Sequence, residues 1–250
     1  MDLPHREEVT LSERIAFLRK AIFFSRLSKE DLRILAGNFH SRKYKSKEII
    51  FHKGDDSRML FVVMKGKVRI FGTGPAGNEI SIRIFSEQDM IGEFAAIDGR
   101  LRSTTAQAVE NCLLLEMEQA RFVQCLREMP DLSMEMIMLL VGKLRWTTAY
   151  VETIAQYNTV GRLIQTLLHY ITKFGKEIEA GKRYEVDLSM SQADLASMVG
   201  ASREWLNRIL RDWSQRGLIE YKRSKITVLD LPAVEKERDR RAKPHAESSE

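Results

Sequence analysis

A long apolar seam in the middle of the chain most constrains how it can fold. Along residues 132–156 the seam positions recur at alternating steps of four and three, which is typical of the a and d positions of a two-stranded coiled coil. The seam residues are Ile137, Val141, Leu144, Thr148, Val151 and Ala155. This pattern predicts a long helix and a homodimer formed through it. The alternative interpretation is a helix that packs only on its own domain.

The patterning on the N-terminal side of this helix is different. From Tyr44 to Met117, short apolar or alternating runs are separated by turns rich in Gly and Asp, which favours a compact antiparallel β domain. Near-helical spacing over residues 9–38 predicts short helices before it, and Glu118–Cys125 reads as another helix. We therefore predict an α+β chain whose first domain spans residues 1–129.

The patterning changes again after the seam. Asn158 and Thr159 interrupt the periodicity and offer a cap for a new helix that ends at Gly175. We place a dimerisation helix and hinge at residues 130–157 and a second domain at residues 158–232. Residues 233–250 are charged and have few apolar anchors, so we expect a disordered tail.

The second domain contains two short helices joined by a glycine turn. Ser191 and Asp194 form a capping box, Gly200 ends the first helix, and Ser202 caps the second. The apolar stripe of the second helix has the spacing i, i+3, i+4 and i+7. Its members are Leu206, Ile209, Leu210 and Trp213. This arrangement is typical of a helix-turn-helix.

The opposite face of that second helix is basic and polar. Arg203 and Arg208 carry planar forks that match the O6 and N7 atoms of guanine, and Glu204 can accept from N4 of cytosine. Two strands with a basic tip over residues 222–225 follow, as expected of a wing. A merely solvated surface face is the alternative interpretation of these charges.

The most informative stretch of the first domain is residues 91–107. Gly92 and Glu93 follow a strand end, and Arg102, Ser103 and Thr104 come ten residues later. Exposed main-chain N–H groups, a hydroxyl and an arginine suit a phosphate, and a carboxylate such as Glu93 suits a ribose hydroxyl. From the residues alone, a surface loop with an ion pair explains the pattern equally well.

Both motifs carry a family resemblance. The segments Gly92–Ala95 and Arg102–Thr104 resemble the phosphate-binding cassette of cyclic-nucleotide-binding domains, and residues 202–210 resemble the recognition helix of the cyclic AMP receptor protein / fumarate-nitrate regulator family of transcription factors. The likeness covers roughly residues 15–230. It implies a jelly-roll-like β-roll sensor domain, a dimer helix, and a winged helix-turn-helix whose orientation changes with ligand. It also implies a bacterial regulator that works with RNA polymerase.

The resemblance also implies roles in ligand binding. Gly92 would present its main chain, Glu93 would bind the ribose, and Arg102 and Ser103 the cyclic phosphate. Aligned back from Gly161–Arg162, two hydroxyl residues on the long helix would contact the base of cAMP. The ligand set is Gly92, Glu93, Arg102, Ser103, Thr104, Thr147 and Thr148. The extra hydroxyl of Thr104 leaves cGMP as an alternative ligand, and Lys143 stands where an arginine normally pairs with the cassette glutamate.

The resemblance implies a DNA site as well. Arg203, Glu204 and Arg208 would read bases in a near-palindromic double-stranded site with TGTGA-like halves. The residues expected at DNA phosphates are Ser191, Trp205, Lys222 and Arg223. Three departures stand out: the interval between Gly92 and Arg102 is one residue shorter than in the family's type member, Gln88 replaces a usual glycine, and Trp205 is bulky for its place.

Composition and charge limit the binding partners and the cellular location that the chain can have. The net charge is only +5, but the segment from Ser202 to Lys225 holds seven basic residues against three acidic ones. The two cysteines, Cys112 and Cys125, lie in apolar runs without metal-ligand spacing, and no apolar stretch is long enough for a membrane span. We expect a cytoplasmic protein with no bound metal.

Two other functions are compatible with parts of the sequence. The first is a transcription regulator of the same fold that responds to a different effector, or to none, and still forms a dimer and binds DNA. Its iron–sulfur form needs an N-terminal cysteine cluster, which the sequence lacks, and no histidine stands out as a haem ligand. An enzyme is disfavoured because no nucleophile–base pair accompanies the cassette.

Overall fold

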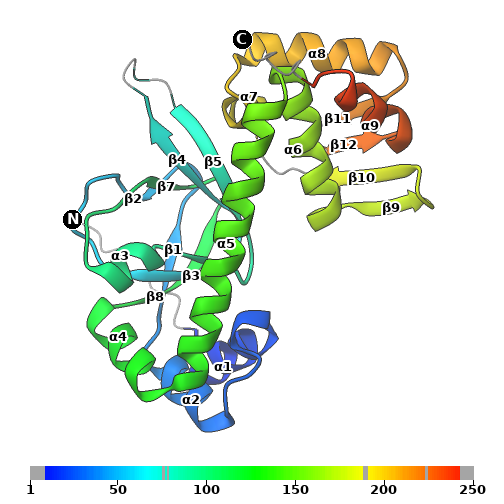
Figure 1. The fold of residues 1–250 in the computed structure, drawn as a ribbon. Coiled ribbons are helices and arrows are strands. Elements are labelled where there is room, and N and C mark those ends of the chain that lie inside the picture. Colours follow the sequence, from blue (N-terminus) through cyan, green and yellow to red (C-terminus); the bar gives the residue numbers. More distant parts are fainter. Residues whose placement is uncertain (1–8, 75–76, 78, 188–190, 223–224, 243–250) are drawn as a thin grey trace, which may run out of the picture. The chain divides into compact units, whose positions relative to one another are not determined.

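The computed structural model describes residues 9–74, 77, 79–187, 191–222 and 225–242, which form two compact units, Met1–Lys143 and Leu144–Glu250 (Figure 1). Helix α5 (Pro130–Gln156) contributes residues to both. Its proline lies in the first turn, where a missing N–H breaks no helical bond. No helix in the described ranges is long and apolar enough to cross a membrane.

Two antiparallel sheets form the first unit. One has the strand order β1-β8-β3-β6 and the other β2-β7-β4-β5. The strands are β1 (His40–Tyr44), β2 (Ile49–Phe51), β3 (Leu60–Lys65), β4 (Val68–Thr73), β5 (Glu79–Phe85), β6 (Met90–Ile91), β7 (Thr105–Ala108) and β8 (Cys112–Met117). The antiparallel β domain is confirmed.

The apolar run of β3 explains how the layers stack. Phe61 and Val63 belong to a core that also holds β4, β7 and β8 residues, whereas Leu60 and Val62 belong to a second core with the helices. Because successive side chains of a strand point to opposite faces, a strand buried on both sides must be apolar throughout. The sheet that contains β3 therefore lies between the other sheet and the helices.

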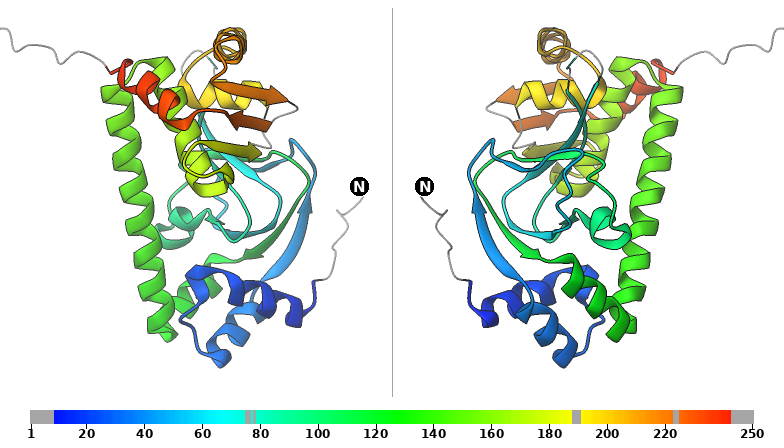
Figure 2. Two further views of the ribbon diagram at one scale, coloured as in Figure 1. Left: turned by 90° about the vertical axis from the view of Figure 1, so that its right-hand side faces the viewer. Right: turned by 90° about the vertical axis from the view of Figure 1, so that its left-hand side faces the viewer.

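The helices of the first unit cover that second core (Figures 1 and 2). They are α1 (Leu11–Lys20), the 3-10 turn η1 (Ile22–Phe24), α2 (Lys29–Gly37), α3 (Glu93–Asp98) and α4 (Gln119–Glu128). Thr10 and Glu13 close a capping box at α1, and Ser28 caps α2. Both cysteines are buried thiols, and burial raises the pKa of Cys112 to about 11.

The second unit is a winged helix built on α6 (Thr159–Phe174). Asn158 caps this helix by accepting from the N–H groups of Val160 and Gly161, each at 3.1 Å. Its sheet has the order β11-β12-β10-β9. The remaining elements are β9 (Lys176–Glu179), β10 (Arg183–Asp187), α7 (Gln192–Val199), α8 (Arg203–Gln215), β11 (Ile219–Lys222), β12 (Lys225–Val228) and α9 (Leu231–Asp239).

Helix α9 corrects the prediction of a disordered tail over residues 233–250. Asp230 caps it by accepting from the N–H of Ala233, and Val234 is buried on its inner face. Glu237 is buried too, and it is paired with Arg216, which directly follows α8, and with Arg241 four residues further along the chain. The charged composition therefore reflects ion pairing in this helix. Residues 243–250 lie outside the described ranges.

Candidate ligand site and DNA-facing helix

The predicted cassette begins at a left-handed glycine. Strand β6 ends at Ile91, Gly92 has φ of 79°, and α3 starts at Glu93. A Cβ atom on Gly92 would lie 2.6 Å from Nη1 of Arg102 and 3.0 Å from the carbonyl oxygen of Met59. Both the positive φ and this close approach require glycine. The structure thus brings Gly92 and Arg102 together, as the sequence predicts for one site.

Arg102 is almost fully buried, with 3% of its surface exposed. Its Nη1 donates to the Gly92 carbonyl at 2.8 Å and its Nη2 to the Met59 carbonyl at 2.5 Å. The guanidinium also lies 4.2 Å from the centroid of the Phe51 ring. Burial lowers the pKa of Arg102, and the Glu93 carboxylate opposes that shift. Its buried Nε has no hydrogen-bond partner among the described residues.

Glu93 is held by Lys143, the partner that the family resemblance implies. Nζ of Lys143 lies 2.8 Å from Oε1 of Glu93 and donates to the Met90 carbonyl at 2.9 Å. Burial lowers the pKa of Lys143, and the Glu93 carboxylate acts in the opposite direction. The lysine therefore satisfies one oxygen of a buried carboxylate with a point charge.

The hydroxyl residues of the cassette differ in exposure. Ser103 is exposed, and its side chain makes no hydrogen bond within the described part of the chain; Thr104 is half-buried. The main chain before them is fixed, because Arg102 N donates to Asp55 O at 3.0 Å and its carbonyl accepts from Gly54 N at 2.8 Å. Ser103 is therefore presented from a rigid edge.

Thr147 and Thr148 lie on the part of α5 that belongs to the second unit, and both are exposed. Oγ1 of Thr148 donates to the carbonyl of Leu144 at 3.1 Å within the helix. Their contact with a ligand base stays a prediction.

Sequence analysis missed the aromatic and cationic surroundings of the cassette. Phe51 lies against Arg102, and the Phe85 ring has Lys143 at 4.9 Å and the guanidinium of Arg83 at 4.9 Å from its centroid. Arg83 of β5 also lies opposite Ile70 of β4, which belongs to the core that contains Phe61 and Val63. The period-2 spacing of Arg83 and Phe85 was the available signal. Arg83 adds positive charge near Lys143, whose own charge is paired with Glu93, and an added cation favours an anionic ligand.

The helix-turn-helix has the caps that the sequence predicts. In α7, Ser191 and Asp194 form a reciprocal capping box, and Gly200 ends the helix with φ of 71°. Ser202 caps α8 by accepting from the N–H of Trp205 at 3.1 Å. The apolar stripe of α8 packs inward through Leu206, Leu210 and Trp213. These features confirm the predicted motif.

The outward face of α8 carries the predicted base-reading residues. Arg203, Glu204 and Arg208 are all exposed. A shallow groove runs along this face, lined by Glu204, Asn207, Arg208, Arg211, Asp212 and Gln215. An exposed helix with two arginine forks near its N-terminal end has the chemistry to read base edges in a DNA groove.

The residues predicted to contact DNA phosphates differ in their exposure and in their existing hydrogen bonds. Lys222 is exposed at the end of β11, opposite Lys225 in the hairpin register. The Ser191 hydroxyl is engaged in its cap, donating to Oδ2 of Asp194 at 2.7 Å, and Trp205 is half-buried. Arg223 lies outside the described residues.

The predicted seam of α5 is exposed in the single chain. Ile137 is 52% exposed, Leu144 66% and Val151 57%, and Val141, Thr148 and Ala155 are exposed as well. An apolar row of this length on one helix is typical of a surface that another chain covers.

An antiparallel β domain with a cassette that suits an anion, followed by a long helix and a winged helix-turn-helix, defines the class of two-domain, ligand-sensing DNA-binding regulators. Comparisons with known proteins agree. Residues 41–129 match the model of the cyclic nucleotide-binding domain, and residues 161–237 match the Crp-like helix-turn-helix domain. No group of residues suited to hold a metal ion occurs in the described part of the chain.

Curated relatives are transcription regulators. The cAMP-activated global transcriptional regulator CRP of Pasteurella multocida is 30% identical over 72% of this chain and 85% of its own length. The CRP-like cAMP-activated global transcriptional regulator of Mycobacterium tuberculosis is 27% identical over 72% of this chain and 80% of its own length. The chain belongs to the CRP/FNR family of transcription regulators.

Solved structures share the fold. A mutant of CooA from Carboxydothermus hydrogenoformans has a TM-score of 0.69 at 19% identity and covers 81% of this chain and 88% of its own. The c-di-GMP responsive global regulator CLP of Xanthomonas campestris has a TM-score of 0.67 at 22% identity, and the match covers 81% of this chain and 99% of its own.

Proposed function

We propose that this protein is a cyclic-nucleotide-responsive regulator that binds cAMP, with cGMP as the alternative ligand, in the cassette around Arg102. The observation that carries the proposal is the buried guanidinium of Arg102, whose Nε has no partner among the described residues, followed in the chain by the exposed Ser103. A buried, fixed cation with a donor to spare suits an anionic phosphate. The cAMP-activated relatives at 27–30% identity support the same ligand class.

Each cassette residue would have a separate task. Arg102 and Ser103 would bind the cyclic phosphate, and the main chain at Gly92 would border it. Glu93, with one oxygen held by Lys143, would accept a hydrogen bond from the ribose hydroxyl. Thr104, Thr147 and Thr148 would contact the base, and the hydroxyl of Thr104 could accept from the amino group of guanine.

A regulator of the same fold with a different effector is the second candidate. CLP of Xanthomonas campestris, a c-di-GMP responsive global regulator, has the same fold with a TM-score of 0.67. The charge of Lys143 is paired with Glu93, but Arg83, whose guanidinium lies 4.9 Å from the centroid of the Phe85 ring, would offer one more cation to a ligand with several anionic groups.

The output would be DNA binding by a homodimer. The exposed seam of α5 would join two chains, and each would place one α8 in the major groove of a near-palindromic site with TGTGA-like half-sites. Arg203 and Arg208 would each read a guanine, and Glu204 the cytosine opposite a guanine. Such a regulator would act in the bacterial cytoplasm with RNA polymerase.

Calorimetry on the full chain tests the ligand site. Titration with cAMP and with cGMP should give saturable heat for at least one of them, and Arg102→Ala should weaken that binding more than tenfold. Arg100→Ala is the matched control, because Arg100 lies two residues away with 86% of its side chain exposed. Heat from neither nucleotide would favour the different effector, and unchanged binding in Arg102→Ala would remove Arg102 from the site.

A further inference from the structure

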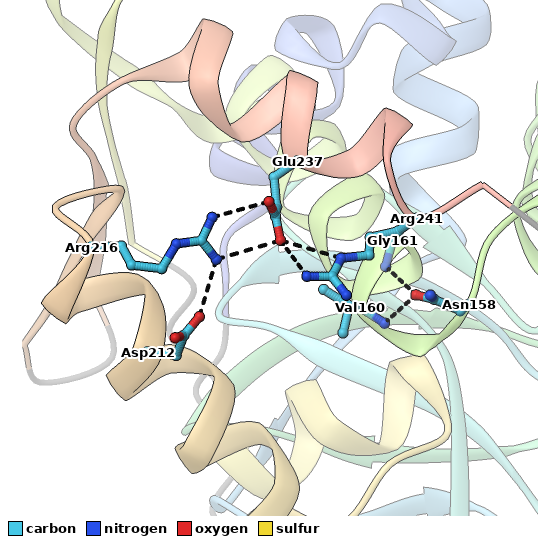
Figure 3. A network of polar contacts seen from close by, with 7 residues as sticks. All are labelled: Asn158, Val160, Gly161, Asp212, Arg216, Glu237 and Arg241. Carbon is cyan, nitrogen blue, oxygen red and sulfur yellow. Dashed lines mark hydrogen bonds and ion pairs between the residues drawn. The ribbon is translucent and has the colours of Figure 1, made fainter.

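The C-terminal end of α8 is tied to α9 by ion pairs. Arg216 directly follows α8 as its C-terminal cap residue. Its Nη1 lies 3.1 Å from Oδ2 of Asp212 one turn back, and its Nη2 lies 3.0 Å from Oε2 of Glu237 on α9 (Figure 3). One arginine therefore joins the last turn of α8 to a glutamate of α9 that comes 21 residues later in the chain.

Glu237 is the centre of this network. Its side chain is 5% exposed, and its Oε1 accepts from Nε and Nη2 of Arg241 at 3.2 and 2.6 Å in addition to the contacts with Arg216. The hydrogen bond from Arg216 lowers the pKa of Glu237, and the same contact raises the pKa of Arg216. A buried carboxylate is tolerated here because two arginines satisfy it.

Arg241 continues the chain of contacts to the hinge segment, residues 157–158. Its carbonyl accepts from the N–H of Asn158 at 3.2 Å, and Ala242 forms a β-bridge with Tyr157. Asn158 is also the residue that caps α6, as Figure 3 shows. The segment from Glu237 to Ala242 thus connects the end of α8 with the point where α5 gives way to α6.

These contacts supply what apolar packing cannot. Leu206, Leu210 and Trp213 bury the inner face of α8, but apolar contacts are non-directional and tolerate small rotations and shifts of a helix. A charge-assisted, two-pronged contact between arginine and carboxylate has a defined geometry. Recognition of bases requires a fixed orientation of α8, because its side chains must lie within hydrogen-bond distance of the base edges.

We propose that Glu237 is a positioning residue for DNA recognition, which holds the recognition helix α8 in its reading orientation by linking Arg216 to the hinge segment through Arg241. The inference rests on the proposed DNA-binding function of α8. It assigns α9 a part in sequence discrimination, although Glu237 carries negative charge and would not itself meet DNA.

The test compares two DNA duplexes, one enriched from a random pool by the wild-type protein and one of random sequence, with cAMP and cGMP both in excess. Glu237→Gln removes the charge and keeps the shape. We expect it to lower the ratio of selected to random affinity at least about tenfold. Glu235→Gln is the matched control, since this neighbouring carboxylate makes no ion pair within the described residues. Glu237→Asp, which keeps the charge, should recover part of the ratio.

This ratio separates positioning from stability. A substitution that only unfolds part of the sample lowers both affinities by the same factor and leaves the ratio unchanged. Arg216→Gln provides a second variant at the exposed end of the network, and the double variant should lose no more discrimination than the worse single one. A wild-type ratio in folded Glu237→Gln and Arg216→Gln overturns the inference. Equal binding of both duplexes by the wild type contradicts the proposed function itself.

Discussion

The ammonium of Lys143 lies 2.8 Å from the carboxylate of Glu93, and this contact joins the long helix α5 to the start of α3. The two residues are separated by 50 positions, and their side chains are 17% and 5% exposed. Because Glu93 directly follows the left-handed Gly92, the lysine fixes the turn that borders Arg102. The candidate ligand site and the helix α5 are therefore connected by an ion pair within the first unit.

Removing this lysine should weaken ligand binding. Lys143→Met leaves a buried carboxylate without its counter-charge, which typically costs about 3–5 kcal/mol, so Glu93 should leave its present position. We expect cyclic-nucleotide affinity to fall more than tenfold in calorimetry, while Lys143→Arg stays within a few-fold of wild type. Equal affinity in Lys143→Met would show that Glu93 needs no partner to do its work.

The Glu237 network should make the second unit sensitive to acid. The pKa of Glu237 lies below its ordinary value of 4.5, so its ion pairs contribute stability that is fully present above that value and is lost as pH falls through the lowered pKa. All three tryptophans, Trp146, Trp205 and Trp213, lie in the second unit, so their fluorescence reports on it alone.

Urea titrations followed by tryptophan fluorescence check this dependence. Between pH 7 and pH 3.5 the midpoint of the wild type should fall more steeply than that of Glu237→Gln, and the two should converge in acid. Parallel pH profiles for the two proteins would mean that the carboxylate does not titrate as the network requires.

Local signals in the sequence predicted the helix-turn-helix well. Ser191, Gly200 and Ser202 cap helices through contacts with residues three or four positions away, and all three caps are present. Local sequence patterns do not predict contacts between residues that are far apart in the chain. Arg102 donates to the carbonyl of Met59, 43 residues away, so its burial could not be predicted. The charged composition of residues 233–250 predicts a disordered tail, whereas Glu237 in that range is paired with Arg216, which lies in another element.

The dimer prediction can be checked by sedimentation. Val141→Glu and Val151→Glu each place a charge on the exposed apolar seam of α5, where dimer formation would bury it without a partner. Both variants should shift toward the mass of a monomer. Arg145→Glu, on an exposed position outside the seam, is the control and should sediment like the wild type. A dimer that survives both seam changes would lie elsewhere on the chain.

The last prediction separates the arginines of α8 from the wing lysine. Arg208 is exposed on the outward face and has the planar fork that matches guanine O6 and N7, so Arg208→Ala should cost about 1–3 kcal/mol and relax specificity at one base position. Lys222, at the end of β11, is a point charge suited to a phosphate. Lys222→Ala should weaken binding to all sequences alike and make the salt dependence shallower.

Unbiased selection of bound sequences by the wild type and both variants, with cyclic nucleotide present, distinguishes these effects. The wild type should enrich two inverted TGTGA-like halves about one helical turn apart. Arg208→Ala should enrich the same halves with one degenerate position, and Lys222→Ala should enrich them unchanged. Trp205 is the residue that could alter this outcome, because it is half-buried beside Glu204 on the first turn of α8 and bulky enough to shift the helix in the groove. A selected consensus without paired TGTGA-like halves would contradict the proposed base-reading roles of Arg203, Glu204 and Arg208, and it would leave the winged helix and the proposal of a dimer unaffected.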